Sequence, residues 1–260
     1  MPEFFRDRGY FATGAGKVYH PNRPPNDDQQ RSWSEPWTGS TGPMAQCPCT
    51  GEPESGVKQA TCEGLATLPA CGDDAIADTI VDRLQRAANG TLGNGSQPFF
   101  IAAGLHKPHL PFHAEPQDFA RYPDPTPPVP ARVPEGMPYV AWHSCLSHSP
   151  GVNFSDWGNW DDIASNRMTI DNPMPAAIAA RLRRGYFASV TYTDRNVGRI
   201  LAAAEPMLPD TVVALIGDHG WSLGEQNEWC KMVLHSPHPF QIAKASTLKG
   251  IVCRPTSRMV

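Results

Sequence analysis

The chain has 260 residues, of which 40% are hydrophobic, and a formal net charge of -4 at pH 7. This length and composition are typical of a globular protein with a substantial single core. The negative charge gives no general electrostatic attraction to nucleic acid, and no run of 18 or more apolar residues is present to span a membrane.

The first predicted element is a strand-like segment that begins near Gly9 and ends in Lys17 and His20. A Pro-, Gly- and Cys-rich insert follows over residues 22–72. Its four cysteines suggest disulfides and a route outside the cytosol, because they lack the paired Cys-x2-Cys spacing and nearby histidines of a zinc site. They are Cys47, Cys49, Cys62 and Cys71. Three Asn-x-Ser/Thr sequons, which begin at residues 89, 94 and 153, agree with a secreted glycoprotein.

A helix is predicted from about Asp73 to Ala88, with Asp73 or Asp74 as its cap. Its apolar residues recur at helical spacing, at Ile76, Ile80, Leu84 and Ala87. The apolar run 98–103 then predicts a strand, which is followed at once by two histidines and a lysine within Leu105–Phe112.

Residues 108–138 contain ten prolines, which predict a long surface loop instead of a helix or a central strand. A second helix is predicted to begin near Pro175. We expect its broad apolar face to carry Ile178, Leu182, Tyr186, Val190, Val197 and Leu201. The β-branched run 211–216 predicts a strand buried on both faces.

This alternation of strands and helices predicts an α/β fold with a mostly parallel central sheet flanked by helices. Polar residues follow three of the predicted strands, and the carboxyl ends of parallel strands are where such sheets hold ligands. They are Lys17 and His20, Lys107 and His109, and Asp218 and His219. We therefore expect the three clusters to converge on one edge, as a site for an anion and a metal.

Three segments carry a resemblance to a known family. Gly16–Pro21, His106–Phe112 and Asp218–Glu225 resemble motifs of the type I sulfatases of the alkaline phosphatase superfamily, and Ser32–Ser34 and Tyr186–Tyr192 add supporting matches. The resemblance implies an alkaline-phosphatase/sulfatase-like fold, incomplete at both ends in this chain. It implies a partial catalytic domain over residues 1–231 and a divergent, irregular tail over 232–260.

The resemblance also implies a chemistry. Family members hydrolyse sulfate esters of sugars with calcium and a formylglycine, which a formylglycine-generating enzyme makes from the cysteine of a Cys-x-Pro-x-Arg motif. Lys17 and Lys231 match the lysines that hold the sulfate oxygens. His20 matches the residue that hydrogen-bonds the hydrated aldehyde. His109 matches the histidine that contacts the substrate and protonates the leaving alkoxide, a task suited to imidazole.

The metal and disulfide expectations come from the same resemblance. Asp218 matches the calcium-ligand aspartate, whereas His219 is a ligand or a sulfate contact, because ring nitrogen is an unusual partner for calcium. A Cys49–Cys62 disulfide would match a loop closed in the family. The family implies degradation of sulfated carbohydrate, including glycosaminoglycan, in the lysosome or outside the cell, although the amino-terminal residues do not form a signal peptide.

The chain departs from the family in its nucleophile. The family's paired aspartates and Cys-x-Pro-x-Arg motif precede the segment that matches here, and Cys253–Arg258 only approximates the second motif because its arginine falls one residue late. We therefore expect a truncated or misassembled gene product that is inactive as written; a deliberately inactive paralogue is the alternative. A phosphoryl or phosphonate hydrolase of the same superfamily and a non-catalytic fragment that binds sulfated glycan also remain open.

Overall fold

The protein is described here by a computed structural model, which covers residues 1–19, 29–38, 61–63, 72–122, 132–138, 142, 170–229 and 242–245. The α-helices are α1 (Pro2–Arg6), α2 (Gln29–Ser32), α3 (Gly72–Ala88), α4 (Pro116–Phe119) and α6 (Ala176–Ala204), and the 3-10 helices are η4 (Glu205–Asp210) and η5 (Glu225–Asn227). The strands are β1 (Phe11–Gly16), β2 (Thr61–Glu63), β3 (Phe99–Gly104), β4 (Phe112–Ala114), β5 (Val213–Ile216) and β6 (Ile242–Ala245).

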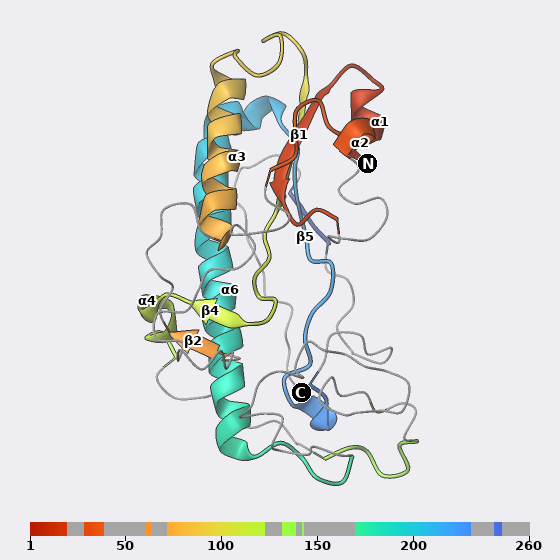
Figure 1. The fold of residues 1–260 in the computed structure, drawn as a ribbon, viewed down its shortest axis with the longest axis vertical. Helices are drawn as coiled ribbons and strands as arrows, with labels where there is room; N and C mark the ends of the chain where they lie inside the picture. The colour runs from red at the N-terminus through yellow and green to blue at the C-terminus, as the bar shows by residue number, and fades with distance from the viewer. Residues whose placement is uncertain are drawn as a thin grey trace.

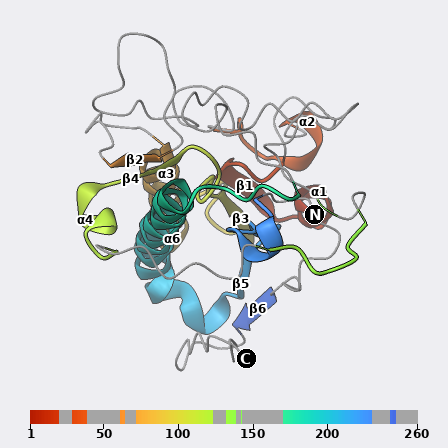
Figure 2. The same ribbon diagram turned by 90° about the horizontal axis from the view of Figure 1, so that it is seen from below.

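The 29-residue helix α6 runs along the long axis of the molecule, with α3 packed beside it (Figure 1). Strands β1 and β3 lie on one side of α6, and β2, β4 and α4 lie on the other (Figures 1 and 2). None of the described helices is both long and apolar enough to cross a membrane.

Strands β1 and β3 form a parallel pair whose six-residue register runs from Phe11↔Phe99 to Gly16↔Gly104. Strands β2 and β4 are also parallel, whereas β5 and β6 are antiparallel. Parallel strands with helices packed against them confirm the predicted α/β class. Within the described residues the strands form three two-stranded sheets instead of one continuous central sheet.

Helix α3 confirms the predicted periodicity, because Ile76, Ile80 and Leu84 are buried against β1 and the end of α6. The predicted role of its aspartates was wrong. The helix begins at Gly72, so Asp73 and Asp74 lie in its first turn instead of at the cap, and their carboxylates bind groups on other elements.

Helix α6 begins after Pro175 as predicted, but its buried face differs from the predicted one. Leu182 is fully buried, whereas Val190 is 42% exposed. The first four residues predicted for this face are spaced four apart, and four residues turn the helix about 40° further than one full rotation. Residues at that spacing therefore move progressively away from a single face of the helix. Polar residues share the buried face with Leu182, Ala188 and Tyr192, and Ser189 and Asn196 have no exposed surface.

The proline-rich segment 108–138 is not a surface loop throughout. Strand β4 and the single-turn helix α4 interrupt it, and Phe112, Ala114 and Phe119 are buried. The prediction was wrong there because the side chains between the prolines pack on α6, and Pro116 occupies the first turn of α4, where a missing N–H costs nothing.

Strand β5 exists as predicted, but it is not buried on both faces. Val212, beside its amino end, is 86% exposed, and Leu215 and Ile216 are about half exposed at 49% and 55%. Within the described residues its only strand partner is β6, and no described helix packs extensively against it. Strand β6 also gives regular structure to part of the tail that was predicted to be irregular.

Candidate functional site

The chain leaves β1 and β3 at the same edge of their sheet. Gly16 and Gly104 are opposite one another, and the Lys17 N–H donates to the Gly104 carbonyl at 2.6 Å. A Cβ at Gly104 would overlap the backbone of Lys17, so only glycine allows this approach. Strand pairing therefore brings Lys17 to the edge at which the loop after β3 begins, whereas His20, the other member of the Lys17 cluster, lies outside the described residues.

The loop His106–Pro111, which follows β3, is closed by its own lysine. Lys107 Nζ donates to the carbonyls of Pro111 at 2.5 Å and His109 at 3.3 Å. Burial lowers the pKa of Lys107 from its ordinary value of 10.5 to about 8, and the nearby Asp73 carboxylate partly opposes this shift. The sequence grouped Lys107 with the anion-binding residues, but its ammonium is directed at the loop's own carbonyls.

His109 is held by contacts inside the same loop. Its backbone N–H donates to the His106 carbonyl at 2.9 Å, and its Nδ1 donates to the Leu110 carbonyl at 2.7 Å. A carbonyl oxygen can only accept, so this bond assigns the proton of a neutral ring to Nδ1. Proton exchange with a substrate would then take place at Nε2.

Sequence reasoning missed Asp73 as part of this loop's support. Asp73 is 1% exposed, and its carboxylate accepts the backbone N–H groups of His106 at 2.8 Å and Lys107 at 2.9 Å. The available signal was an acidic pair at a helix start that comes shortly before a strand and its polar loop, although such a pair more often caps its own helix.

The segment that carries the third cluster, Asp218 and His219, packs in the hydrophobic core against the residues that follow the Lys107–His109 cluster. Trp221 and Leu223, which follow Asp218 and His219, are buried with Phe112 of β4 in one core cluster. The rings of Phe112 and Trp221 meet edge to face, with centroids 5.9 Å apart. The segment after β5 is thus anchored beside the loop that carries His109, although β5 itself does not pair with β1 or β3 within the described residues.

Asp218 and His219 lie at an exposed turn. The side chain of Asp218 is 82% exposed and that of His219 is 41% exposed, with 3.5 Å between the carboxylate and Nε2. A hard cation suits the Asp218 oxygens, whereas a ring nitrogen is an unusual ligand for calcium. Among the residues that the structure describes, no group of three or more His, Cys, Asp or Glu side chains could hold a metal ion. Asp218 therefore fits such an ion as one ligand of a larger set.

Several predicted site residues fall outside the described part of the chain. They are His20, Lys231 and Cys49, and of Cys62 only the backbone is described, paired with His113 between β2 and β4. The Cys49–Cys62 disulfide and the roles of His20 and Lys231 therefore remain predictions.

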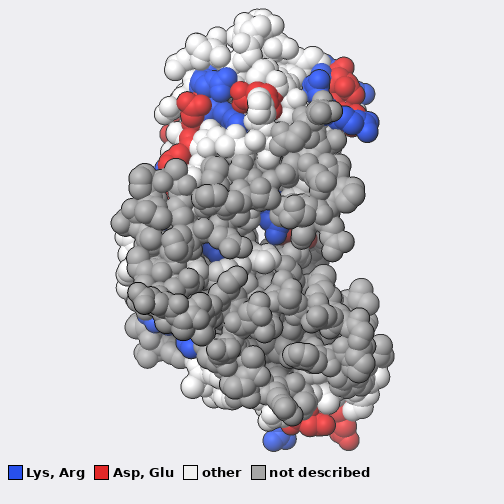
Figure 3. Space-filling view, in the orientation of Figure 1, with Lys and Arg blue, Asp and Glu red and all other residues white. Residues whose placement is uncertain are grey.

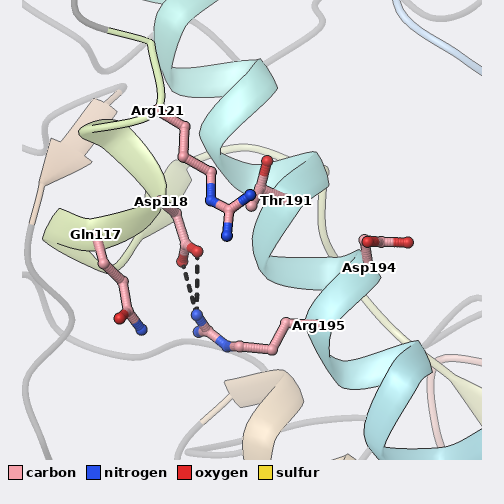
Figure 4. A pocket seen from close by; sticks show the side chains of 6 residues that line it. All are labelled: Gln117, Asp118, Arg121, Thr191, Asp194 and Arg195. Atoms are coloured by element: carbon pink, nitrogen blue, oxygen red, sulfur yellow. Dashed lines mark hydrogen bonds and ion pairs between the residues drawn. The ribbon is translucent and has the colours of Figure 1, made fainter.

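A separate hollow of about 300 Å³ lies between α4 and α6 (Figure 4). Arg195 Nη1 contacts both carboxylate oxygens of Asp118 there, at 3.0 and 3.2 Å. Burial raises the pKa of Asp118, while the Arg195 charge lowers it. The hollow's remaining lining residues are Gln117, Arg121, Thr191 and Asp194. This ion pair binds α4 to α6 on a part of the helix that carries none of the predicted site residues.

Exposed charges of both signs are interspersed on the face in Figure 3, over α1 and the carboxyl end of α3. Ion pairs such as Arg31–Glu3 at 2.7 Å and Arg86–Glu35 at 3.4 Å account for part of this mixture. An anionic ligand would therefore find no broad basic patch among the described residues of this face, and its binding would depend on local groups.

Comparison with known proteins identifies the family. The Sulfatase family model matches residues 1–251, beyond the domain boundary predicted at Lys231. Human iduronate 2-sulfatase is 31% identical over 255 residues, which cover 89% of this chain and 42% of that protein. A sulfatase of Formosa agariphila is 26% identical over 247 residues, which cover 90% of this chain and 44% of that protein.

Among solved structures, BT4656 in complex with its substrate D-glucosamine-2-N,6-O-disulfate superimposes with a TM-score of 0.48 at 18% identity, covering 88% of this chain and 51% of that one. The chain spans less than half the length of the curated relatives named above. The match of the family model to almost the whole sequence is decisive, and the chain belongs to the sulfatase family.

Proposed function

We propose that this chain forms part of a sulfuric ester hydrolase that removes sulfate from a sulfated sugar, in the manner of iduronate 2-sulfatase. The observation that carries the proposal is the meeting of β1 and β3 at Gly16 and Gly104, which brings Lys17 and the loop of His109 to one edge. A cationic amine and an imidazole at one edge suit an ester that is anionic and has a poor leaving group.

The two described residues take different tasks. Lys17 offers a compact positive charge to the sulfate oxygens, and Lys231 is proposed to do the same from the segment after β5. His109 acts as an imidazolium: it donates the proton on Nε2 to the departing sugar oxygen and is left as the neutral ring, whose remaining proton stays on Nδ1 in the hydrogen bond to the Leu110 carbonyl. His20 is proposed to orient the nucleophile by a hydrogen bond.

A divalent cation, calcium in this proposal, supplies Lewis-acid neutralisation of the sulfate charge when it is bound. Asp218 is the residue of this chain that suits it, and His219 serves as a further ligand or as a sulfate contact. The nucleophile is proposed to be a formylglycine that a formylglycine-generating enzyme makes from a Cys-x-Pro-x-Arg motif. This sequence contains no such motif. A lysosomal or extracellular location accompanies the proposal.

The substrate class rests on the relatives. Iduronate 2-sulfatase is about 30% identical to this chain in both its human and its mouse forms. Similarity at that level supports a sulfated carbohydrate, with a 2-sulfated iduronate unit of glycosaminoglycan as the first compound to test.

The test compares the purified 260-residue chain with a polypeptide that adds the family's Cys-x-Pro-x-Arg segment, co-expressed with the formylglycine-generating enzyme. We expect the chain alone to leave 4-methylumbelliferyl sulfate intact, because lysines and histidines cannot replace the nucleophile, and the extended polypeptide to release the fluorophore. Hydrolysis of the phosphate ester in preference to the sulfate ester would favour a phosphoryl hydrolase instead. Binding of a sulfated disaccharide without turnover by the extended polypeptide would favour a glycan-binding role.

A further inference from the structure

We propose that Asp73 is a positioning residue for His109: its buried carboxylate fixes the backbone of the loop that presents the imidazole. The statement that Asp73 anchors the loop depends only on the contacts in this fold. The statement that this anchoring serves catalysis rests on the proposed function, in which His109 is the proton donor.

The Asp73 carboxylate is fully committed to this loop. Oδ1 accepts the His106 N–H at 2.8 Å and lies 3.3 Å from the His106 ring nitrogen Nδ1, while Oδ2 accepts the Lys107 N–H at 2.9 Å. Hydrogen bonds to an ionised acceptor are roughly twice as strong as neutral ones. A buried carboxylate with both oxygens bound to consecutive amides therefore fixes the direction in which the chain leaves β3.

The rest of the loop is tied to the segment that Asp73 holds. The His109 N–H donates to the carbonyl of His106, and Lys107 Nζ reaches the carbonyls of His109 and Pro111. From α6, the Thr193 hydroxyl donates to the Lys107 carbonyl at 3.0 Å. Both residues whose amides donate to Asp73 are thus bonded directly to His109, so a displacement at residues 106 and 107 would carry the imidazole with it.

The carboxylate itself is held in place by the packing of two helices. The Tyr192 hydroxyl of α6 donates to the carboxylate of Asp74 at 2.7 Å and accepts the Asp74 backbone N–H at 3.1 Å. Tyr192 is 1% exposed, so this link lies in the interior. The first turn of α3 is thereby fixed on α6, and Asp73, the preceding residue, is fixed with it.

Replacing Asp73 with asparagine would keep the shape but remove the function of the side chain. A carboxamide has one acceptor oxygen and one NH2 group, whereas the loop presents two backbone donors and a ring nitrogen to this position. One amide would therefore lose its acceptor. Asp82→Asn is the matched control, because Asp82 lies on the same helix with its side chain 66% exposed and pairs with Arg86 at 3.8 Å.

The experiment measures amide hydrogen exchange and the ring 15N shifts of His109 by NMR in the 260-residue chain. In Asp73→Asn we expect the amides of His106 and Lys107 to exchange about tenfold faster or more, relative to Leu84 in α3. We also expect the ring nitrogens of His109 to move toward a mixture of tautomers. Asp82→Asn should leave both unchanged.

Two outcomes would overturn the proposal. One is a folded Asp73→Asn protein with unchanged loop amides and an unchanged His109 ring; the other is an equal loss of protection throughout α3 and β3, which would mean a structural role alone. If Asp73→Asn does not fold, the wild-type protein provides the test. Slowed exchange of the His106 and Lys107 amides supports their hydrogen bonds to the Asp73 carboxylate, whereas exchange at the rates of unprotected amides contradicts these bonds. Since no measurement depends on turnover, a lack of sulfatase activity would refute only the proposed function.

Discussion

The rings of Phe112 and Trp221 meet edge to face, with centroids 5.9 Å apart and an interplanar angle of 84°. Phe112 lies three residues beyond His109, and Trp221 lies three residues beyond Asp218. This contact in the hydrophobic core therefore links the two segments from which an acid catalyst and a metal ligand are proposed. Because β5 does not pair with β1 or β3 within the described residues, this apolar packing contributes to the relative placement of those groups.

Phe112→Ala should consequently destabilise the protein by about 3–5 kcal/mol, because Phe112 has no exposed surface and its removal leaves a cavity. Urea denaturation followed by tryptophan fluorescence measures the loss. Phe112→Leu, which retains most of the volume, should cost less than about 1.5 kcal/mol. Val190→Ala, at an exposed position of α6, should change stability by about 0.5 kcal/mol or less. Similar losses for Phe112→Ala and Val190→Ala would contradict the core that we describe.

The elements with a local signal were predictable from the sequence. Ile76, Ile80 and Leu84 repeat at helical spacing, and the apolar run that ends at Ala103 gave β3 to within one residue at each end. Parallel pairing then brought the residues after β1 and β3 together, as expected for two strands that run in the same direction. Local periodicity and strand direction are both properties that a sequence displays directly.

The features that the sequence did not predict depend on partners distant in the chain. Strand β5 has the composition of a buried strand, but burial depends on which elements pack against it, and Ile216 is 55% exposed. Asp73 was expected to serve its own helix, because short-range capping is the commoner use of an acidic residue there. Its actual partners, the amides of residues 106 and 107, are more than 30 residues away.

The buried ammonium of Lys107 should make stability depend on alkaline pH. Its pKa is lowered to about 8 in the folded protein and is 10.5 otherwise, so between these values the folded state binds fewer protons than the unfolded state. The free energy of unfolding should therefore rise with pH across that window. This gain in the free energy of unfolding is fully present above about pH 10.5 and is lost as pH falls through about 8. Its full size is about 3 kcal/mol.

Lys107→Met cannot titrate, and its stability should therefore lack this rise. Urea denaturation of both proteins from about pH 7 to about pH 10.5 gives the difference curve, in which the effects of all other groups cancel. Parallel curves for the wild type and Lys107→Met would show that the amine is not buried in the way that the loop indicates.

Calcium should bind weakly to the 260-residue chain. Asp218 offers one exposed carboxylate, while calcium requires six to eight oxygen ligands, so we expect a dissociation constant of about a millimolar or weaker. Isothermal calorimetry measures it, with Asp218→Asn as the control. Adding the paired aspartates that the family carries should increase the affinity, and that increase should disappear in Asp218→Asn. Micromolar binding by the bare chain would require ligands that our account does not include.

His109 should affect leaving groups unequally in a polypeptide that includes the Cys-x-Pro-x-Arg segment. A sugar alkoxide needs protonation as it departs, whereas 4-methylumbelliferone leaves readily without it. His109→Ala should therefore lower kcat/KM by about 10²–10⁴-fold for a sulfated sugar and much less for the aryl sulfate. Lys17→Met removes a charge that is proposed to contact the sulfate, which both substrates carry, so its losses should be similar for the two.

Steady-state kinetics of both variants with both substrates decide the assignment. The ratio of the two losses isolates the proton transfer, because a general disturbance of the site by either substitution would slow both reactions together. Equal losses in His109→Ala would leave His109 as a binding residue and remove its role as the acid. Since the Leu110 carbonyl holds Nδ1 protonated, the proton that this comparison detects is the one on Nε2, and it should be delivered only while the loop keeps the ring in that orientation.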